Sequence, residues 1–231
     1  MSEIISIPIL PVLITLSTFY VGIIVQRKLK TPLCNPILVA VVLILVILSL
    51  TGMDLKTYQA GNTRFSWLLA PATVSLAVPM YEHFKILRKN ISVLLVGVAA
   101  GAISCLVMVL GFCCVFHFSP EMIISLLPKS VTTAIGVPLS EMAGGITPIT
   151  TAAIVVTGVT ASVLGPTLCN FFHLTDDIAQ GAAYGTAGHV VGTSKAIESS
   201  ALAGAASSLS LVVAGLLTAV VFPIVTAYFL R

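Results

Sequence analysis

Charged side chains are scarce in this chain. Only 8% of its residues are Asp, Glu, Lys or Arg, and 58% are hydrophobic, whereas soluble domains carry about 25% charged residues. The mean hydropathy is +1.12. The longest polar gap, 54–64, has only the length of a loop. This composition predicts an integral membrane protein without a soluble domain.

Several functional classes are disfavoured by what is missing. The net charge of +3 is small and spread over loops, and no basic patch with interleaved aromatic residues predicts nucleic-acid binding. Neither a G-x-S-x-G nor an H-E-x-x-H motif is present, and there is no Walker motif. Lys129-Ser130 is not expected to be a catalytic dyad, because adjacent residues on a helix point in different directions. We therefore expect a protein that is not an enzyme and needs no cofactor.

Metal and disulfide frameworks are also not expected. The chain has five cysteines, an odd number, and all lie in or beside apolar runs without metal-ligand spacing. Buried packing is the simplest role for them. They are Cys34, Cys105, Cys113, Cys114 and Cys169.

Long uncharged runs recur along the chain, and strand-like alternation is absent, which disfavours a β-barrel. A membrane-spanning helix needs roughly 20 apolar residues, and only the third run falls short of that length. We predict an all-α, polytopic helical bundle of about seven or eight membrane segments, in a single domain covering 1–231. The runs are Ile4–Gln26, Thr31–Met53, Phe65–Tyr81, Ile91–Phe116, Ile146–Phe172 and Gly204–Leu230.

The first run is not a cleavable signal, because Glu3 precedes it and Gln26-Arg27-Lys28 follows it. Basic residues cluster after it, at 27–30, and again at Lys85, Arg88 and Lys89. Basic residues in short loops mark the cytoplasmic side of a membrane. Two spans separate the clusters, so both can face the cytoplasm, which places the N-terminus outside.

Three segments interrupt the apolar pattern. Segment 181–195 is glycine-rich, and 127–138 is short and polar, which predicts a half-helix that enters the protein and breaks there. Pro71 and Pro79 interrupt segment 69–81, because proline removes a backbone donor and kinks helices. Loosened backbone at bilayer depth persists only where it is buried in protein or lines a wet cavity. The predicted breakers are Pro71, Pro79, Gly185, Gly188 and Gly192.

The order of these segments suggests a duplication with units 31–118 and 144–231. Each unit would contain a long span, an interrupted segment and a second long span. Paired interrupted segments in two halves are typical of transporters with a site at the repeat interface. The alternative is that Pro and Gly are simply common in membrane helices. The sequence leaves open whether 122–143 re-enters or crosses the membrane.

Lys129 is the first candidate for a binding residue. A lysine at membrane depth is costly in lipid and is a functional candidate by default. It could attract an anion that nearby hydroxyls then hold, as helix N-termini hold carboxylates. The alternative is a lysine that extends to the interface. The hydroxyls are those of Ser130, Thr132 and Thr133.

His189 is the second candidate, because it lies mid-segment between Gly188 and Gly192. An imidazole suits proton coupling, although a neutral histidine bonded to a neighbouring helix is a frequent arrangement. Thr186 and Thr193 would add hydroxyls, and Lys195 a charge. Lys195 could instead form a surface pair with Glu198. The other histidines, His83, His117 and His173, lie at span ends, and Asp176 is best explained as a helix cap.

The sequence resembles the LrgB/CidB family of bacterial membrane proteins over nearly its whole length. The motifs that carry this resemblance are Leu127-Pro-Lys-Ser-Val-Thr-Thr133, Gly144-Gly145-Ile146, Gly165-Pro166, Gly185-Thr-Ala-Gly-His-Val-Val-Gly-Thr-Ser-Lys195, Asn35-Pro36 and Leu69–Tyr81. The chain has Gly188 where the family usually has Ser. It has Thr193-Ser194-Lys195 where the family has Thr-Ala-Arg, so bidentate arginine chemistry is lost.

The resemblance implies two kinds of function in a multi-pass protein of the bacterial cytoplasmic membrane. The first is transport of a small monocarboxylate of the pyruvate, glycolate or glycerate type, with or without coupling to a proton or cation. The alternative is an antiholin- or holin-associated regulator of murein hydrolase export and autolysis. That regulator would act with a small LrgA/CidA-type partner in the bilayer. Homo-oligomers are possible in either case. The broken segments with hydroxyls, lysines and His189 favour transport.

Overall fold

The computed structural model describes residues 9–29 and 35–229, and in these ranges the chain forms helices and their connections without a strand. The predicted all-α class is therefore confirmed. The chain divides into two compact units, Met1–Ser75 and Leu76–Arg231. The predicted repeat of 31–118 and 144–231 stays a prediction.

The first unit contains α2, α3 and α4, which pack on one another, followed by α5. Local signals set the ends of α3. The Asn35 side chain accepts a hydrogen bond from the Ile37 backbone N–H (2.8 Å), and Pro36 occupies the first helical position. Gly52, at φ 68°, ends the helix. In chain order the elements are α2 (Leu10–Leu29), α3 (Pro36–Thr51), α4 (Leu55–Asn62), a 3₁₀ turn (Thr63–Phe65) and α5 (Ser66–Ser75).

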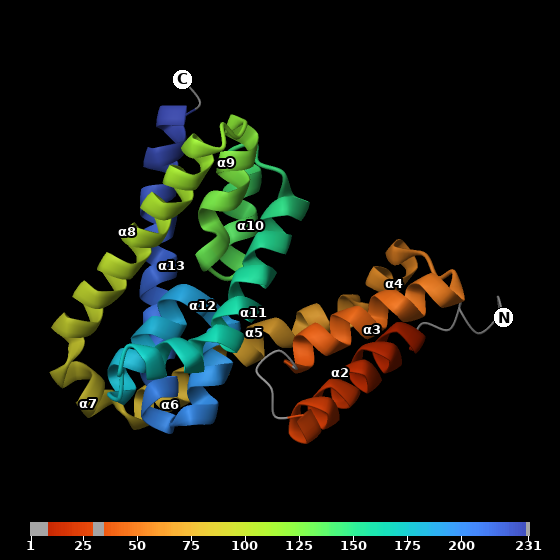
Figure 1. Ribbon diagram of the computed structural model, residues 1–231, viewed down its shortest axis with the longest axis horizontal. Coiled ribbons are helices and arrows are strands. Elements are labelled where there is room, and N and C mark those ends of the chain that lie inside the picture. Colours follow the sequence, from red (N-terminus) through yellow and green to blue (C-terminus); the bar gives the residue numbers. More distant parts are fainter. Residues whose placement is uncertain (1–8, 30–34, 230–231) are drawn as a thin grey trace. The chain divides into compact units, whose positions relative to one another are not determined.

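The second unit is built around α8, α11, α12 and α13 (Figure 1). Helix α8 runs alongside α13, and α12 contacts α8, α11 and α13. Its elements are α6 (Ala77–Glu82), α7 (Phe84–Lys89), α8 (Ile91–Val115), α9 (Pro120–Leu126), the 3₁₀ turn η2 (Leu127–Ser130), α10 (Thr133–Met142), α11 (Thr147–Phe171), α12 (Asp177–Ser199) and α13 (Ala201–Phe229).

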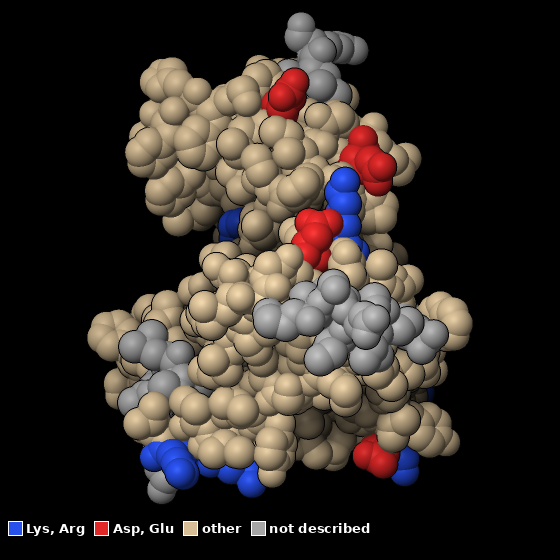
Figure 2. All heavy atoms as spheres, turned by 90° about the vertical axis from the view of Figure 1, so that its right-hand side faces the viewer, with Lys and Arg blue, Asp and Glu red and all other residues tan. Residues whose placement is uncertain are grey.

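Within the described residues, four helices are long and apolar enough to cross a membrane. They are Leu10–Leu29, Ile91–Val115, Thr147–Phe171 and Ala201–Tyr228, in good agreement with four of the predicted runs. The remaining long run, Thr31–Met53, contains the shorter helix α3. Its N-cap Asn35 and its C-cap Gly52 limit this helix to 16 residues. Large hydrophobic side chains on the outer faces of α8 and α13 are exposed. On the face that Figure 2 shows, charged side chains are few and most of the surface comes from other residues.

The predicted half-helix at 127–138 is part of a broken helix. Ser119 and Pro120 begin α9, which continues into the 3₁₀ turn η2. The backbone is then extended at Val131 (φ −109°, ψ 171°) and Thr132 (φ −67°, ψ 151°) before α10 begins. Helix α12 is also broken, because His189 has φ 42° and ψ −134°. The segments that the sequence marks as interrupted, 127–138 and 181–195, are therefore both discontinuous.

The same kinds of element precede the two broken helices, α9–α10 and α12. Helices α8 and α11 each have 25 residues. Two residues after the end of each helix lies a histidine with positive φ, His117 (52°) after α8 and His173 (55°) after α11, and a broken helix follows. Within the second unit, the same kinds of element thus precede both broken helices.

The prolines of segment 69–81 disrupt the helices less than the sequence predicts. Pro71 lies inside α5, and the helix continues to Ser75. Pro79 lies in the first turns of the short helix α6. The interruption falls at Leu76, between the two prolines, which is also where the two units meet along the chain.

Glycines allow α12 to pack closely on its neighbours. A Cβ added at Gly181 or Gly185 would collide with the backbone carbonyl oxygen of Ala203 or Ser207 on α13. A Cβ at Gly192 would collide with the Tyr184 carbonyl oxygen. Eight residues of straight helix span about 12 Å, so this contact means that the two halves of α12 fold sharply toward each other at His189.

We expect Gly185→Ala to destabilise the protein by about 1–3 kcal/mol, because its methyl group would overpack the contact with α13. Gly111→Ala is the matched control. Gly111 is exposed, with nothing within 4 Å of an added Cβ, so the substitution should be neutral or stabilising by up to about 1 kcal/mol. Thermal unfolding in detergent measures both. Equal stability of the two variants would contradict the close packing.

Candidate anion-binding site

A cavity of about 900 Å³ lies within the second unit, between α8, α11, α12 and η2. Along α8 it follows one face from Asn90 to Cys105, a helical distance of about 22 Å. Small residues at Gly97 and Gly101 leave room for it. Most of its walls are apolar, as is usual for ligand pockets with a few placed polar groups.

Lys129 and Ser130 lie at the inner end of this cavity. The Lys129 Nζ atom is 3.6 Å from Cys105 Sγ and 3.5 Å from Ser130 Oγ. The Ser130 Oγ and Cys105 Sγ atoms are 2.8 Å apart. Cys105 lies near the middle of α8. If α8 spans the bilayer, the Lys129 ammonium group is near mid-height, which does not fit a lysine that extends to the interface.

The contacts of Lys129 are weak ones for an ammonium group. A thiol sulfur and a hydroxyl at 3.5–3.6 Å are poor replacements for water. Within the described ranges, the one ion pair closer than 4 Å joins Lys195 to Glu198, so no described carboxylate neutralises Lys129. A positive charge of this kind at membrane depth is costly, and an entering anion would lower that cost.

Thr186 supplies a second polar group at the same place. It comes from α12, lines the cavity beside Cys105 and Ser130, and is 8% exposed. Among the described residues, its Oγ1 is the buried side-chain oxygen or nitrogen without a hydrogen-bond partner. A buried, unpaired hydroxyl costs about 1–3 kcal/mol, and such a group is explained when a ligand or water completes it.

Hydrophobic packing closes the structure beyond the inner end. A void of about 10 Å³ continues past Cys105, Ser130 and Thr186, which is about the size of one water molecule. A core cluster from α8, α9, η2 and α13 then fills the space. Its buried members are Leu106, Val109, Cys113, Ile123, Ile124, Leu127 and Phe222. The cavity therefore ends at Lys129 rather than passing through the unit.

His189 lies at the break of α12, but it is not among the cavity residues. It is 4% exposed, and its Nε2 is 2.9 Å from the Ile154 carbonyl oxygen of α11. Gly158 makes room for the ring, because a Cβ there would lie 2.7 Å from Nε2. This is the bonded, buried arrangement that the sequence offers as the alternative to a proton-linked group. The coupling role stays a prediction.

The remaining candidates take structural positions. Thr193 donates a hydrogen bond to the His189 carbonyl oxygen (2.8 Å) and pairs with Ser207 of α13 (2.8 Å). Thr132 is the N-cap residue of α10, and Thr133 is its exposed first residue. None of the three lines the cavity. The capping role expected of Asp176 is confirmed, since its side chain accepts a hydrogen bond from the Ala179 backbone N–H (2.9 Å).

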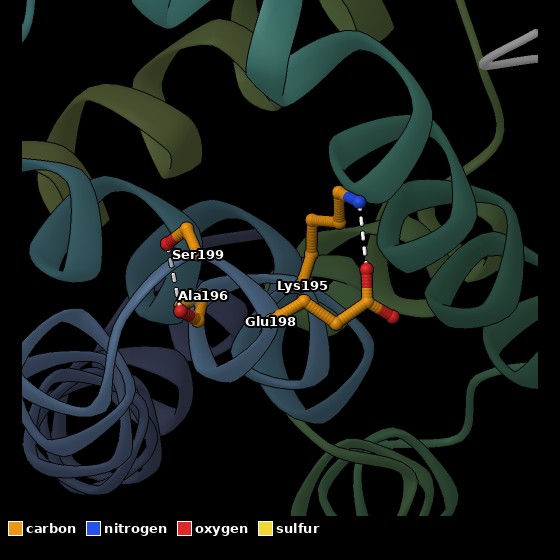
Figure 3. A network of polar contacts seen from close by, with 4 residues as sticks. All are labelled: Lys195, Ala196, Glu198 and Ser199. Carbon is orange, nitrogen blue, oxygen red and sulfur yellow. Dashed lines mark hydrogen bonds and ion pairs between the residues drawn. The ribbon is translucent and has the colours of Figure 1, made fainter. Parts of the chain in front are cut away.

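Lys195 is also outside the cavity. Its Nζ is 2.7 Å from Glu198 Oε2, and the Glu198 side chain is 60% exposed (Figure 3). Ser199 donates to the Ala196 carbonyl oxygen one turn away. The structure thus gives Lys195 the surface pairing that the sequence allows, whereas Lys129, Ser130 and Thr186 are brought together.

Cys105 belongs to this cluster, although the sequence indicates only packing for it. The available signal is the four-residue spacing of Gly97, Gly101 and Cys105, which puts small side chains along one face of α8. The 3₁₀ turn η2 also brings Lys129 and Ser130 within 3.5 Å. The expectation that the Lys129 and Ser130 side chains point in different directions, as neighbours on a helix do, is therefore wrong. That the chain is not an enzyme stays a prediction.

An all-helical, multi-pass membrane protein with broken helices is the class that the fold defines. The sequence model of the LrgB-like family matches residues 15–228. The holin-like protein CidB of Staphylococcus epidermidis is 33% identical over 221 residues, covering 96% of each chain. The holin-like protein CidB of Staphylococcus aureus is 31% identical over the same length and coverage. No solved structure matches.

The chain belongs to the LrgB family, and with its long apolar helices it is a bacterial membrane protein with several spans. The family resemblance drawn from its motifs is therefore confirmed. Its position in a lipid bilayer follows from the same findings.

The backbone at His189 gives a test of the break. Its φ of 42° and ψ of −134° belong to a region that residues with a Cβ rarely adopt, at a cost of about 1–3 kcal/mol. We therefore expect His189→Gly to unfold at a higher temperature than His189→Ala, since both lose the ring contact with Ile154. A higher unfolding temperature for His189→Ala would show that α12 is continuous there.

Proposed function

We propose that the second unit binds a small monocarboxylate of the pyruvate, glycolate or glycerate type and that the protein carries it across the membrane. The observation that carries the proposal is the position of Lys129. Its ammonium group lies at the inner end of a cavity of about 900 Å³, where its hydrogen-bond partners among the described residues are a thiol and a hydroxyl. A carboxylate there would gain a charge-assisted hydrogen bond.

The neighbouring groups suit the rest of such a ligand. Thr186 and Ser130 can donate or accept hydrogen bonds, so they fit the keto or hydroxyl oxygen beside the carboxylate. The apolar walls, from residues such as Val93, Leu164 and Leu168, exclude water around the charge pair and so strengthen it.

The broken helices support carriage rather than static binding. Transporters often build their site where discontinuous helices meet, because breaks give the chain places to move. Here the break at Val131–Thr132 directly follows Lys129, and η2 contacts α12. The cavity runs toward Asn90, next to the basic residues Arg88 and Lys89. By the positive-inside rule this end faces the cytoplasm.

A holin-associated regulator is the second candidate, and the names of the relatives favour it. Both relatives are called holin-like. In this role the protein would modulate murein hydrolase export and autolysis together with a small LrgA/CidA-type partner. Lys129 would then serve assembly or gating rather than carriage.

Uptake of labelled pyruvate, glycolate and lactate into proteoliposomes tests the first candidate. We expect Lys129→Ala to lower uptake at least about tenfold, which corresponds to about 1.4 kcal/mol. Thr186→Val should lower it several-fold, because it removes one hydrogen bond of about 1 kcal/mol.

Lys195→Ala is the matched control, because it removes an equal charge that is paired at the surface. It should transport like the unmodified protein. Equal uptake by the Lys129→Ala and Lys195→Ala proteins would contradict the assignment of the site.

Autolysis separates the two candidates. In a deletion strain with altered autolysis, carriage predicts that the Lys129→Ala protein fails to restore the original lysis rate, whereas the Lys195→Ala protein restores it. Full restoration by the transport-dead Lys129→Ala protein would favour the regulator instead.

A further inference from the structure

The Cys105 thiol forms part of the inner end of the cavity. Its Sγ is 2.8 Å from Ser130 Oγ and 3.6 Å from Lys129 Nζ. It is half-buried, so part of the side chain is accessible. It lines both the large cavity and the small void beyond it. A reagent that travels the length of the cavity therefore meets this thiol beside a positive charge.

Thr186 is an independent sign that this place accommodates a ligand. It is 8% exposed, and among the described residues its Oγ1 is the buried side-chain atom that lacks a partner. Thr186 lines the same two spaces as Cys105. A group with a hydrogen-bonding oxygen placed between Lys129 and Thr186 would also lie next to the Cys105 sulfur.

We propose that Cys105 is a modification site for small, negatively charged thiol-reactive compounds, selected by the charge of Lys129. The cavity supplies the path, Lys129 attracts the anionic end, and Cys105 is the nucleophile. Alkyl methanethiosulfonates with a sulfonate group belong to this class. Their dimensions fit easily in a space of about 900 Å³.

The chemistry is a simple displacement. The Cys105 thiol loses its proton to water, and its sulfur attacks the sulfenyl sulfur of the reagent. A new S–S bond forms, the S–SO₂ bond breaks, and methanesulfinate leaves. The product is a mixed disulfide whose sulfonate group lies beside Lys129. A reducing thiol reverses it.

The test compares two reagents of similar size and opposite charge, the sulfonatoethyl and the trimethylammonioethyl methanethiosulfonates. One protein keeps only Cys105, with the other four cysteines replaced by serine. The matched control keeps only Cys114, which is exposed at the C-terminal end of α8. Mass spectrometry of the intact protein in nanodiscs gives the reaction rates.

We expect the ratio of anionic to cationic reagent rates to be roughly tenfold higher at Cys105 than at Cys114, because a local charge in a low-dielectric cleft raises the concentration of its counter-ion. Lys129→Gln should bring the Cys105 ratio down to the Cys114 value. Raising the salt concentration should lower the ratio in the protein that retains Lys129. Added pyruvate should slow the anionic reagent at Cys105 and not at Cys114.

Equal ratios at the two cysteines, or no reaction at Cys105 while Cys114 reacts, would overturn the proposal. Neutral methyl methanethiosulfonate is the control for folding. An unchanged rate of this reagent at Cys105 in the Lys129→Gln protein shows that the cavity persists, and the salt series needs no substitution at that lysine.

The modification site rests on the proposed function in two respects, the protection by pyruvate and the effect on uptake. If the protein carries monocarboxylates through this cavity, the sulfonate-modified Cys105 protein should lose uptake and recover it after reduction. Selective labelling without any measurable carriage in unmodified protein would count against the carriage proposal and leave the site at Cys105 intact. If the protein transports monocarboxylates but Cys105 is not labelled selectively, the result would count against the site at Cys105 and leave the carriage proposal intact.

Discussion

The site depends on one constraint: Lys129 lies beside the middle of α8 and has no charged partner among the described residues. The Lys129 ammonium group has Cys105 Sγ and Ser130 Oγ as its contacts. A buried charge is tolerated only when it is paired, hydrated or used. The cavity gives it access to water and anions, and the small residues Gly97 and Gly101 of α8 leave the space for that access. The apolar cluster around Leu127 and Phe222 then fixes where the cavity ends.

The two helix breaks place the residues of this site. Lys129 is in a 3₁₀ turn because α9 gives way to an extended backbone at Val131 and Thr132. Thr186 lies one turn before the break of α12 at His189. That break is stabilised by the ring contact with Ile154 and by close glycine packing. Both broken helices follow a 25-residue helix and, two residues after its end, a histidine with positive φ, so the same local order precedes both sides of the site.

Much of this arrangement follows from the sequence. Uncharged runs give the long helices, because length and hydropathy alone decide which helices can span a membrane. Glycine content predicts that segment 181–195 is broken, and short length and polarity predict the same of 127–138. The capping role of Asp176 follows from its position before a helix. The motifs Leu127–Thr133 and Gly185–Lys195 identify the family. These predictions depend on properties of short segments.

The rest depends on contacts between segments distant in the chain. Lys129 and Lys195 are indistinguishable by spacing, yet one enters a cavity and the other pairs with Glu198. Cys105 is hidden in an apolar run, and only its approach to η2 shows it as part of the site. His189 has a ring partner 35 residues away, on α11. The positive φ values of His117 and His173 are likewise not visible in the composition of the sequence.

The central claim is that Lys129 receives a carboxylate. The most direct measurement is the ¹⁹F line width of trifluoroacetate in the presence of the purified protein, compared with its Lys129→Gln variant at the same concentration. If Lys129 holds the anion, the unmodified protein should broaden the signal, and the variant should leave it close to that of free trifluoroacetate. Equal broadening by the two proteins would contradict the account.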